Sequence, residues 1–360
     1  MLKKAAALLL VWASIVAWVG CGTTTSKYLF AAIPGSNEIV VFREDPNSGA
    51  LTQIVGSPIT AGQAVQSLAL HPSKKYMYAA NSGATPTGTV SLFNVSSQGA
   101  LSEQTPRFNV GTAPTLLTMD SAGSFLYVGN SGSFDISVFS IDAGSGKLSA
   151  VTQSGGGATA PIGMSPLNMQ LSPSGKTLFV TGQAIIGQGT VAAFPVNNGV
   201  LAAPVVSATG NAPYGLAIDT GGTHLYTANK IDNSVSAFKI NTDSSLTPIS
   251  TTGQTSTGPV ALFIDKSGKY LYVANSQSSG NLSAFSIGSD GGITLLSNSP
   301  FVTASQPNFI AGEASGKYLF VGNQSTPVVQ SFSLDASSGT LTSVASYSVP
   351  GTPTSIVITP

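Results

Sequence analysis

A seven-residue window recurs seven times along the chain at a spacing close to 48 residues. The windows read KYLFAAI at 27, KYMYAAN at 75, SFLYVGN at 124, KTLFVTG at 176, THLYTAN at 223, KYLYVAN at 269 and KYLFVGN at 317. Their third residues lie 48, 49, 52, 47, 46 and 48 positions apart. A repeat of this length fits a four-stranded unit that packs on copies of itself. We therefore expect one repeat domain, although a chain of 360 residues would ordinarily suggest two or three domains.

Two aromatic positions repeat with the same period. The fourth position of the window is Phe30, Tyr78, Tyr127, Phe179, Tyr226, Tyr272 and Phe320. A second strand with alternating apolar residues follows each window, and its fifth position is Phe42, Phe93, Phe139, Phe194, Phe238, Phe285 and Phe332. A cofactor site would not repeat in all seven units. These rings are therefore expected in the core between packed sheets.

The turns and the chain ends predict how the repeats are arranged. Turns such as DPNSGAL at 45 open with Asp and close with Gly, which supplies an Asx hydrogen bond and a positive φ. They lack the alternating oxygen ligands of a calcium loop, so no metal or cofactor is expected. A further strand precedes every window except the first, whereas the C-terminal TSIVITP has no window after it. We predict an all-β, seven-bladed β-propeller over residues 28–360, in which strand 354–359 completes the first blade and closes the ring.

The N-terminus predicts export. Residues 1–20 hold two lysines and then an apolar run from Ala5 to Val19, which is typical of a signal peptide and too short to span a bilayer as a helix. The layout resembles a bacterial lipoprotein leader, in which Cys21 would be the lipidated first residue and residues 21–27 the tether. The alternative is an ordinary secretory signal followed by an incidental cysteine. The expected location is the bacterial cell envelope, periplasmic or at the cell surface.

The charge content excludes polyanionic partners. Charged residues make up 8% of the chain, the formal net charge is zero, and the only arginines are Arg43 and Arg107. Because no basic stripe is available for phosphates, nucleic acid is not an expected partner. Membrane contact is expected only through the lipid anchor, and the protein is expected to be a monomer.

The two histidines and several carboxylates take repeated structural positions. His224 is the second residue of its window, where the other repeats have Tyr28, Tyr76, Phe125, Thr177, Tyr270 and Tyr318. His71 opens the turn before a window, a position that the other repeats fill with Asp120, Ser172, Asp219, Asp265 and Glu313. Carboxylates spread one per blade around a rim cannot converge as an acid/base pair. We therefore predict no catalytic residue among them.

The opposite face of the ring carries the candidate ligand-binding residues, which lie at the predicted channel mouth. Asparagine ends five windows, and a proline opens most of the innermost strands. The candidates are Asn81, Asn130, Tyr214, Asn229, Lys230, Asp232, Asn275, Asn308 and Asn323. Neutral amides suit an uncharged, hydroxyl-rich ligand such as a carbohydrate. The alternative is that Asn is present because it tolerates the turn after the strand.

The motifs YVAN, YVGN, YTAN and FVTG, with SGKYLYV and the Asp-to-Gly turns, resemble the YVTN-type lactonase family. The resemblance extends from Lys27 to Pro360. It implies a seven-bladed propeller related to 6-phosphogluconolactonases and muconate lactone cycloisomerases. Three polar motifs of that family are missing from this sequence. Pro213 is followed by Tyr-Gly in place of Arg-His, Asn229 by Lys-Ile in place of Glu-Leu, and NSQSSG at 275 replaces an Asn-Arg-Gly-His run.

The missing motifs lead to two functional hypotheses. The first is a lactonase-like propeller that acts as a binding or scaffolding module for a neutral carbohydrate, a lactone or an envelope protein. The alternative is a lactone hydrolase or cycloisomerase with a divergent site that uses Lys230, Asp232 and Tyr214.

Overall fold

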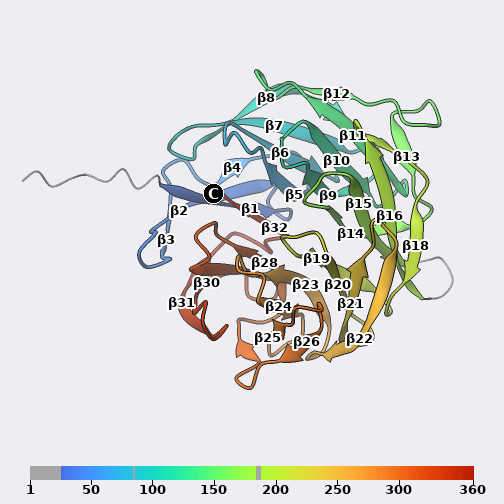
Figure 1. The fold of residues 1–360 in the computed structure, drawn as a ribbon. Helices are drawn as coiled ribbons and strands as arrows, with labels where there is room; N and C mark the ends of the chain where they lie inside the picture. Colours follow the sequence, from blue (N-terminus) through green and yellow to red (C-terminus); the bar gives the residue numbers. More distant parts are fainter. Residues whose placement is uncertain (1–25, 84–85, 184–187) are drawn as a thin grey trace, which may run out of the picture.

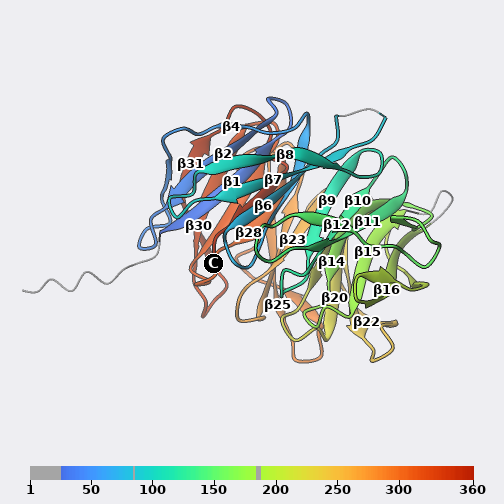
Figure 2. The same cartoon turned by 90° about the horizontal axis from the view of Figure 1, so that it is seen from above.

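A computed structural model describes residues 26–83, 86–183 and 188–360 (Figure 1). It contains seven antiparallel sheets arranged as the blades of a ring, as predicted (Figures 1 and 2). The predicted signal peptide and Cys21 lie outside the described residues. Within the described ranges, no helix is long and apolar enough to cross a membrane.

The blades share one strand order from the channel outward. The innermost strands of blades 1 to 7 are β32 (Ser355–Ile358), β5 (Val65–Leu70), β9 (Pro114–Met119), β14 (Ser165–Leu171), β19 (Pro213–Ile218), β23 (Pro259–Ile264) and β28 (Pro307–Gly312). The second strands are β1 (Lys27–Ile33), β6 (Tyr76–Asn81), β10 (Phe125–Asn130), β15 (Thr177–Gln183), β20 (His224–Asn229), β24 (Tyr270–Asn275) and β29 (Tyr318–Asn323). The third strands are β2 (Glu38–Glu44), β7 (Thr89–Val95), β11 (Asp135–Ile141), β16 (Gly189–Asn197), β21 (Ser234–Ile240), β25 (Asn281–Ile287) and β30 (Val328–Leu334).

The outermost strand is continuous in three blades and interrupted in four. The continuous strands are β8 (Leu101–Asn109), β22 (Leu246–Gln254) and β31 (Leu341–Ser348). The interrupted pairs, both members of which pair with the third strand, are β3 (Leu51–Gln53) with β4 (Ile59–Thr60), β12 (Leu148–Ala150) with β13 (Thr159–Pro161), β17 (Val200–Leu201) with β18 (Val205–Ala208), and β26 (Ile293–Leu295) with β27 (Phe301–Val302). The interruption was not predicted.

The C-terminal strand closes the ring, as the unpartnered final strand predicted. β32 pairs antiparallel with β1, from Leu29 opposite Ile358 to Ala32 opposite Ser355. β32 also contacts β5 on one side and β28 on the other, so the innermost strands touch their neighbours around the whole channel. The paired strands begin at Lys27, one residue before the predicted start of the propeller.

The repeated aromatic residues form the core between blades. Tyr226 of blade 5 is fully buried against Leu271 and Phe285 of blade 6. Phe238 of blade 5 packs with Phe179 of blade 4. The seven core clusters each join two neighbouring blades in this way. Two apolar faces brought together bury more surface than either blade could bury alone.

A turn glycine of the next blade explains the aromatic residues at the second window position. A Cβ built on Gly49 would lie 2.3 Å from the Tyr318 ring, and one on Gly291 would lie 2.2 Å from His224 Cδ2. Both glycines have positive φ. His224 therefore occupies the position of an aromatic ring that covers a neighbouring turn, as its place in the repeat predicts.

Candidate functional site

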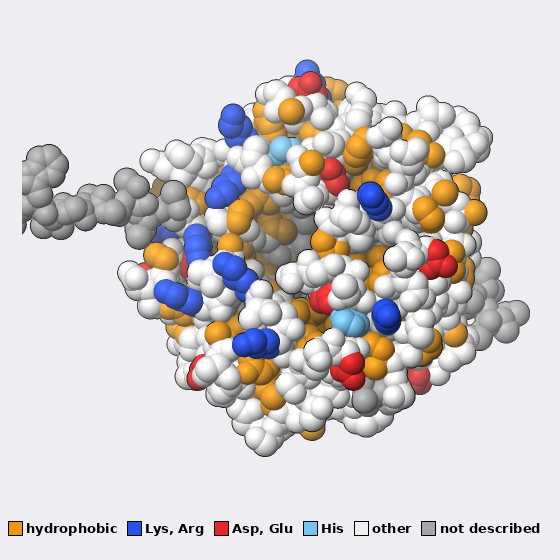
Figure 3. Space-filling view, in the orientation of Figure 1, with side chains coloured by type: hydrophobic (Ala, Val, Ile, Leu, Met, Phe, Trp, Pro, Cys, Tyr) orange, Lys and Arg blue, Asp and Glu red, His pale blue; other side chains and the backbone are white. Residues whose placement is uncertain are grey.

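The ring has two faces, which the second strands connect. We call the face at which these strands end the mouth face, and the face at which they begin the turn face. Because β20 runs from His224 to Asn229, His224 lies at the turn face and Lys230 at the mouth face. The view in Figure 3 shows the turn face, with the two histidines and several lysine or arginine side chains around a central hollow.

A β-bulge opens most of the innermost strands at the mouth face. In β19, Pro213 pairs with Asn229 and Gly215 pairs with Ala228, so Tyr214 has no partner across the sheet. The same shift occurs in β28 around Asn308 and in β14 around Leu167. A bulge turns the extra side chain away from the regular ladder. Here it directs these residues toward the central cavity, which all three line.

The channel holds a cavity of about 600 Å³. It extends from Tyr214, Lys230, Ser276 and Gln324 at the mouth face to Thr220 near the turn face. Among the described residues that line it, Lys230 carries the only charged side chain. A volume of this size is typical of small-molecule sites.

Lys230 and Tyr214 form the most distinctive contact at the mouth. The Lys230 Nζ lies 4.6 Å from the centroid of the Tyr214 ring, which is a cation–π contact. Tyr214 is 38% exposed, and the Lys230 backbone N–H donates to the Ala212 carbonyl at 2.9 Å. Neither Nζ nor the Tyr214 hydroxyl forms a hydrogen bond within the described chain. Both groups are therefore available to a ligand.

Asp232 does not join this pair. One of its carboxylate oxygens accepts the Asn211 backbone N–H at 2.7 Å, and the other accepts the Asn211 side-chain amide at 2.9 Å. It is absent from the residues that line the cavity. The structure therefore places Asp232 in a loop-stabilising role, apart from the predicted site.

Five of the predicted ligand-binding asparagines are buried within their own blades, and their amide nitrogens donate to side chains of the third strand. The contacts are Asn81 with Ser91 at 3.0 Å, Asn130 with Asp135 at 2.7 Å, Asn229 with Ser236 at 2.9 Å, Asn275 with Ser283 at 2.9 Å and Asn323 with Gln330 at 3.2 Å. They are at most 1% exposed and do not line the cavity. The structure places these five side chains inside their blades and away from the cavity, and ligand binding by them stays a prediction.

Asn308 lies at the mouth as predicted, but part of its hydrogen-bonding capacity is used. Its Nδ2 donates to the Pro353 carbonyl at 2.7 Å, which ties blade 7 to the strand that closes blade 1. Its Oδ1 is buried and has no partner among the described residues. Thus Tyr214, Lys230 and Asn308 are the predicted residues that the structure brings together at the cavity.

The histidines and the turn carboxylates have structural partners on the turn face. His224 Nδ1 lies 2.9 Å from Asp219 Oδ2, while Asp219 accepts the Thr223 N–H at 2.7 Å. His71 Nδ1 lies 2.7 Å from Ser73 Oγ, and its Nε2 lies 3.0 Å from the Gly123 carbonyl. These contacts agree with the turn roles predicted from the repeat.

Two buried glutamates, Glu44 and Glu313, lie where blades 1 and 7 meet. Lys27 forms an ion pair with Glu313, and burial of Glu313 is outweighed by hydrogen bonds from Lys27 and Ser315, which lower its pKa to about 2. Glu44 is 2% exposed, and neither of its carboxylate oxygens has a partner within the described ranges. Burial raises the pKa of Glu44 to about 7. These residues belong to the ring closure and lie outside the cavity.

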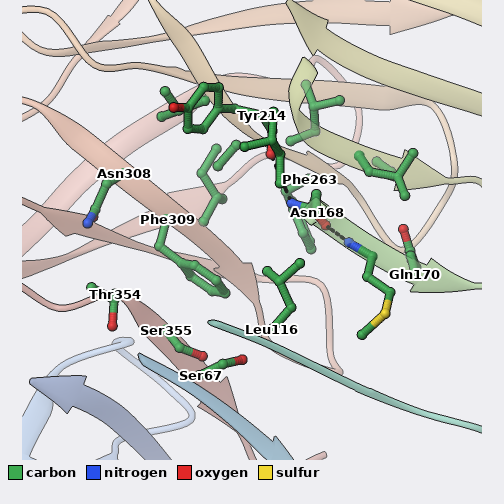
Figure 4. A pocket seen from close by; sticks show the side chains of 18 of the residues that line it. Ser67, Leu116, Asn168, Gln170, Tyr214, Phe263, Asn308, Phe309, Thr354 and Ser355 are labelled. Atoms are coloured by element: carbon green, nitrogen blue, oxygen red, sulfur yellow. Dashed lines mark hydrogen bonds between the residues drawn. The ribbon is translucent and has the colours of Figure 1, made fainter. Parts of the chain in front are cut away.

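The sequence reasoning missed the apolar wall of the cavity. Leu116, Phe263 and Phe309 line it, and Figure 4 shows Leu116 and Phe309 pointing into the same space from different strands. The available signal was the residue that follows each bulge. Phe309 stands directly after Asn308, and Leu116 after Thr115, which the register of β9 also skips.

Comparisons with known proteins agree with this architecture. Residues 19–358 match a family model described as a seven-bladed β-propeller lactonase. A 6-phosphogluconolactonase of Sodalis glossinidius is 27% identical over 337 residues, which cover 90% of this chain and 96% of the relative. A 6-phosphogluconolactonase of Erwinia tasmaniensis is 27% identical over 343 residues, covering 92% and 98%.

Solved structures give the same fold. The periplasmic gluconolactonase of Pseudomonas aeruginosa superposes with a TM-score of 0.77 at 19% identity, over 93% of this chain and 99% of that one. A protein from Lactobacillus plantarum superposes with a TM-score of 0.78 at 20% identity, over 92% and 99%. By the match of the family model to nearly its whole length, the chain belongs to the seven-bladed β-propeller lactonase family.

Proposed function

We propose that the protein hydrolyses an unphosphorylated lactone at the mouth of its channel. The observation that carries the proposal is the position of Lys230, the single charged side chain among the described residues lining the cavity, with its ammonium group free of protein hydrogen bonds. Of the two hypotheses drawn from the sequence, family membership favours the lactonase over the binding or scaffolding module.

The chemistry needs a cation where negative charge develops. Water adds to the lactone carbonyl carbon, and the carbonyl oxygen becomes an oxyanion that the Lys230 ammonium stabilises by a hydrogen bond. The bond between the carbonyl carbon and the ring oxygen then breaks, and the ring oxygen takes the proton that the added water gives up. The resulting hydroxy acid releases its carboxyl proton at neutral pH. Tyr214 acts through Lys230, because its ring holds the ammonium group at the mouth.

The preference for an uncharged lactone follows from the cations available. Phosphate groups are bound well by arginine forks or by several donors together. The two arginines of the sequence lie on β2 and β8, away from the cavity. One lysine suits a carbonyl oxygen better than a doubly charged phosphate.

The test is proton release from a panel of sugar and aliphatic lactones by residues 22–360, which include every described strand. Lys230→Ala should lower kcat/KM by about a hundredfold to a thousandfold, as loss of an oxyanion donor does. Lys239→Ala, which removes an exposed lysine from β21 of the same blade, should leave kcat/KM unchanged. Equal activity of the Lys230 variant and the wild type would contradict the proposal.

Tyr214 provides a second test with a conservative control. Tyr214→Leu removes the ring and should lower kcat/KM about two- to fivefold, the value of a cation–π contact at a partly exposed site. Tyr214→Phe keeps the ring and should retain wild-type turnover. A loss in the Phe variant equal to that in the Leu variant would instead assign the role to the hydroxyl group.

A further inference from the structure

We infer that the lactone carries an apolar substituent, which lies in the channel below Lys230. This inference rests on the proposed function, since Lys230 fixes the position of the lactone ring. It concerns the substrate class, which neither the family nor the proposed chemistry determines.

The wall of the channel offers apolar contacts below the mouth. Leu116 and Phe309 face the same space, and Phe263 lines the cavity with them (Figure 4). Val260 and Leu167, which occupy the bulge positions of blades 6 and 4, add apolar surface nearer the mouth. A ligand that extends from Lys230 into the channel therefore meets these apolar side chains.

Two hydroxyl groups of the channel wall, those of Ser67 and Ser355, are already engaged between blades. Ser67 Oγ accepts the Leu117 backbone N–H at 3.1 Å, and Ser355 Oγ accepts the Leu68 backbone N–H at 3.1 Å. These bonds connect neighbouring innermost strands. The serines therefore stabilise the ring and offer a ligand only the remaining capacity of each hydroxyl.

Two further polar side chains of the wall, Thr354 and Asn168, are bound in a similar way, whereas Asn308 Oδ1 has no partner among the described residues. Thr354 Oγ1 donates to the Gln66 carbonyl at 2.7 Å. Asn168 Nδ2 donates to the Tyr214 carbonyl at 3.2 Å, and its Oδ1 accepts the Met169 N–H at 2.8 Å. A sugar lactone could use Asn308 Oδ1 and the Gln170 amide, but its other hydroxyl groups would give up water for few new partners, which is unfavourable. An alkyl substituent has no hydrogen bonds with water to lose when it enters the channel.

The contribution of the apolar substituent to kcat/KM is measurable in a series of lactones that share one ring. Each methylene taken from water into an apolar channel contributes about 0.8 kcal/mol, or about fourfold in kcat/KM. We would compare δ-valerolactone with δ-lactones that carry a methyl, propyl or pentyl group beside the ring oxygen, and with glucono-δ-lactone. The expected result is a rise in kcat/KM along the alkyl series, with the pentyl compound far above glucono-δ-lactone.

Two variants locate the substituent. Leu116→Gln makes the channel wall polar at similar volume and should flatten the rise in kcat/KM along the alkyl series. Ile231→Ser changes an apolar side chain that is 63% exposed on the mouth face outside the channel, and it should leave the series intact. Flattening by Ile231→Ser in place of Leu116→Gln would overturn the channel placement. Circular dichroism of each variant checks folding. The comparison of the lactones with the wild-type protein tests the inference even if a variant fails to fold.

The outcomes separate this inference from the proposed function. Turnover of the short and sugar lactones without a gain along the alkyl series would overturn the inference and leave the proposed function standing. If no lactone is turned over, calorimetry with the corresponding alkyl-substituted δ-lactams decides. Lactam binding that tightens with chain length would support the apolar site and refute only the hydrolysis, whereas chain-independent or absent binding would refute both.

Discussion

Replacement of Glu44 by glutamine is expected to stabilise the protein at alkaline pH and to have little effect at acidic pH. Glu44 is 2% exposed, its two carboxylate oxygens have no partner among the described residues, and burial raises its pKa from 4.5 to about 7. A group whose folded-state pKa is raised binds its proton more tightly when folded. Ionisation of Glu44 therefore lowers the free energy of unfolding. This loss is absent below pH 4.5, grows as the pH rises from 4.5 to 7, and is complete above pH 7.

The size of the effect follows from the shift in pKa. Each unit corresponds to 1.36 kcal/mol, so a shift from 4.5 to about 7 corresponds to at most ~3 kcal/mol. Glutamine has the same shape and carries no charge at any pH. Glu44→Gln should thus raise the free energy of unfolding by roughly 2 to 3 kcal/mol at pH 8 and by less than about 0.5 kcal/mol at pH 4.5.

The assay is urea-induced unfolding of wild type and variant at pH 4.5, 6 and 8. Glu38→Gln, at the other end of β2, serves as the matched control and should show no comparable gain with pH. A Glu44→Gln variant that is destabilised by the same amount at all three pH values would refute the reasoning. It would mean that Glu44 is ionised when folded and is held by Lys27.

Three further predictions concern the ring and its predicted anchor. Deletion of residues 353–360 removes β32 from β1, β5 and β28, and should lower the melting temperature by roughly 10 °C or abolish cooperative unfolding. Gly291→Ala places a Cβ 2.2 Å from His224 Cδ2 at a φ of +80°, and should cost about 2 to 4 kcal/mol in urea unfolding; Gly35→Ala, with open space around it, should cost less than about 1 kcal/mol. If Cys21 is lipidated, Cys21→Ser should move the protein from the membrane fraction to the soluble fraction, and unchanged membrane retention would contradict the anchor.

The sequence predicted the fold well because the repeat supplies seven observations of each position. His224 alone could be taken for a catalytic base, but its alignment with Tyr270 and Tyr318 identifies it as a ring that covers a turn. The closure by β32 was predictable for a related reason. The C-terminal strand has no window after it, and the first window has no strand before it. Pairing the two leaves no unpaired inner edge in the first blade.

The site was harder to predict because side-chain direction depends on register. The asparagines that end the windows lie at the mouth face in sequence terms, but regular pairing keeps Asn229 and Asn275 inside their blades. Tyr214 reaches the cavity because a bulge removes it from the ladder. A proline before Tyr214 marks the start of the strand, whereas the bulge itself depends on hydrogen bonds that no sequence pattern specifies.

The same distinction explains how one ring can carry different chemistry. Tyr226 and Phe238 hold neighbouring blades together, so replacing them removes core contacts from two blades at once. Tyr214 and Lys230 lie where the ladder is broken or has ended, and they belong to none of the seven inter-blade core clusters. They can therefore change without loss of the ring. These are also the positions where the family resemblance places Arg-His and Asn-Glu-Leu, so the chain keeps the scaffold of the family while its mouth carries different side chains.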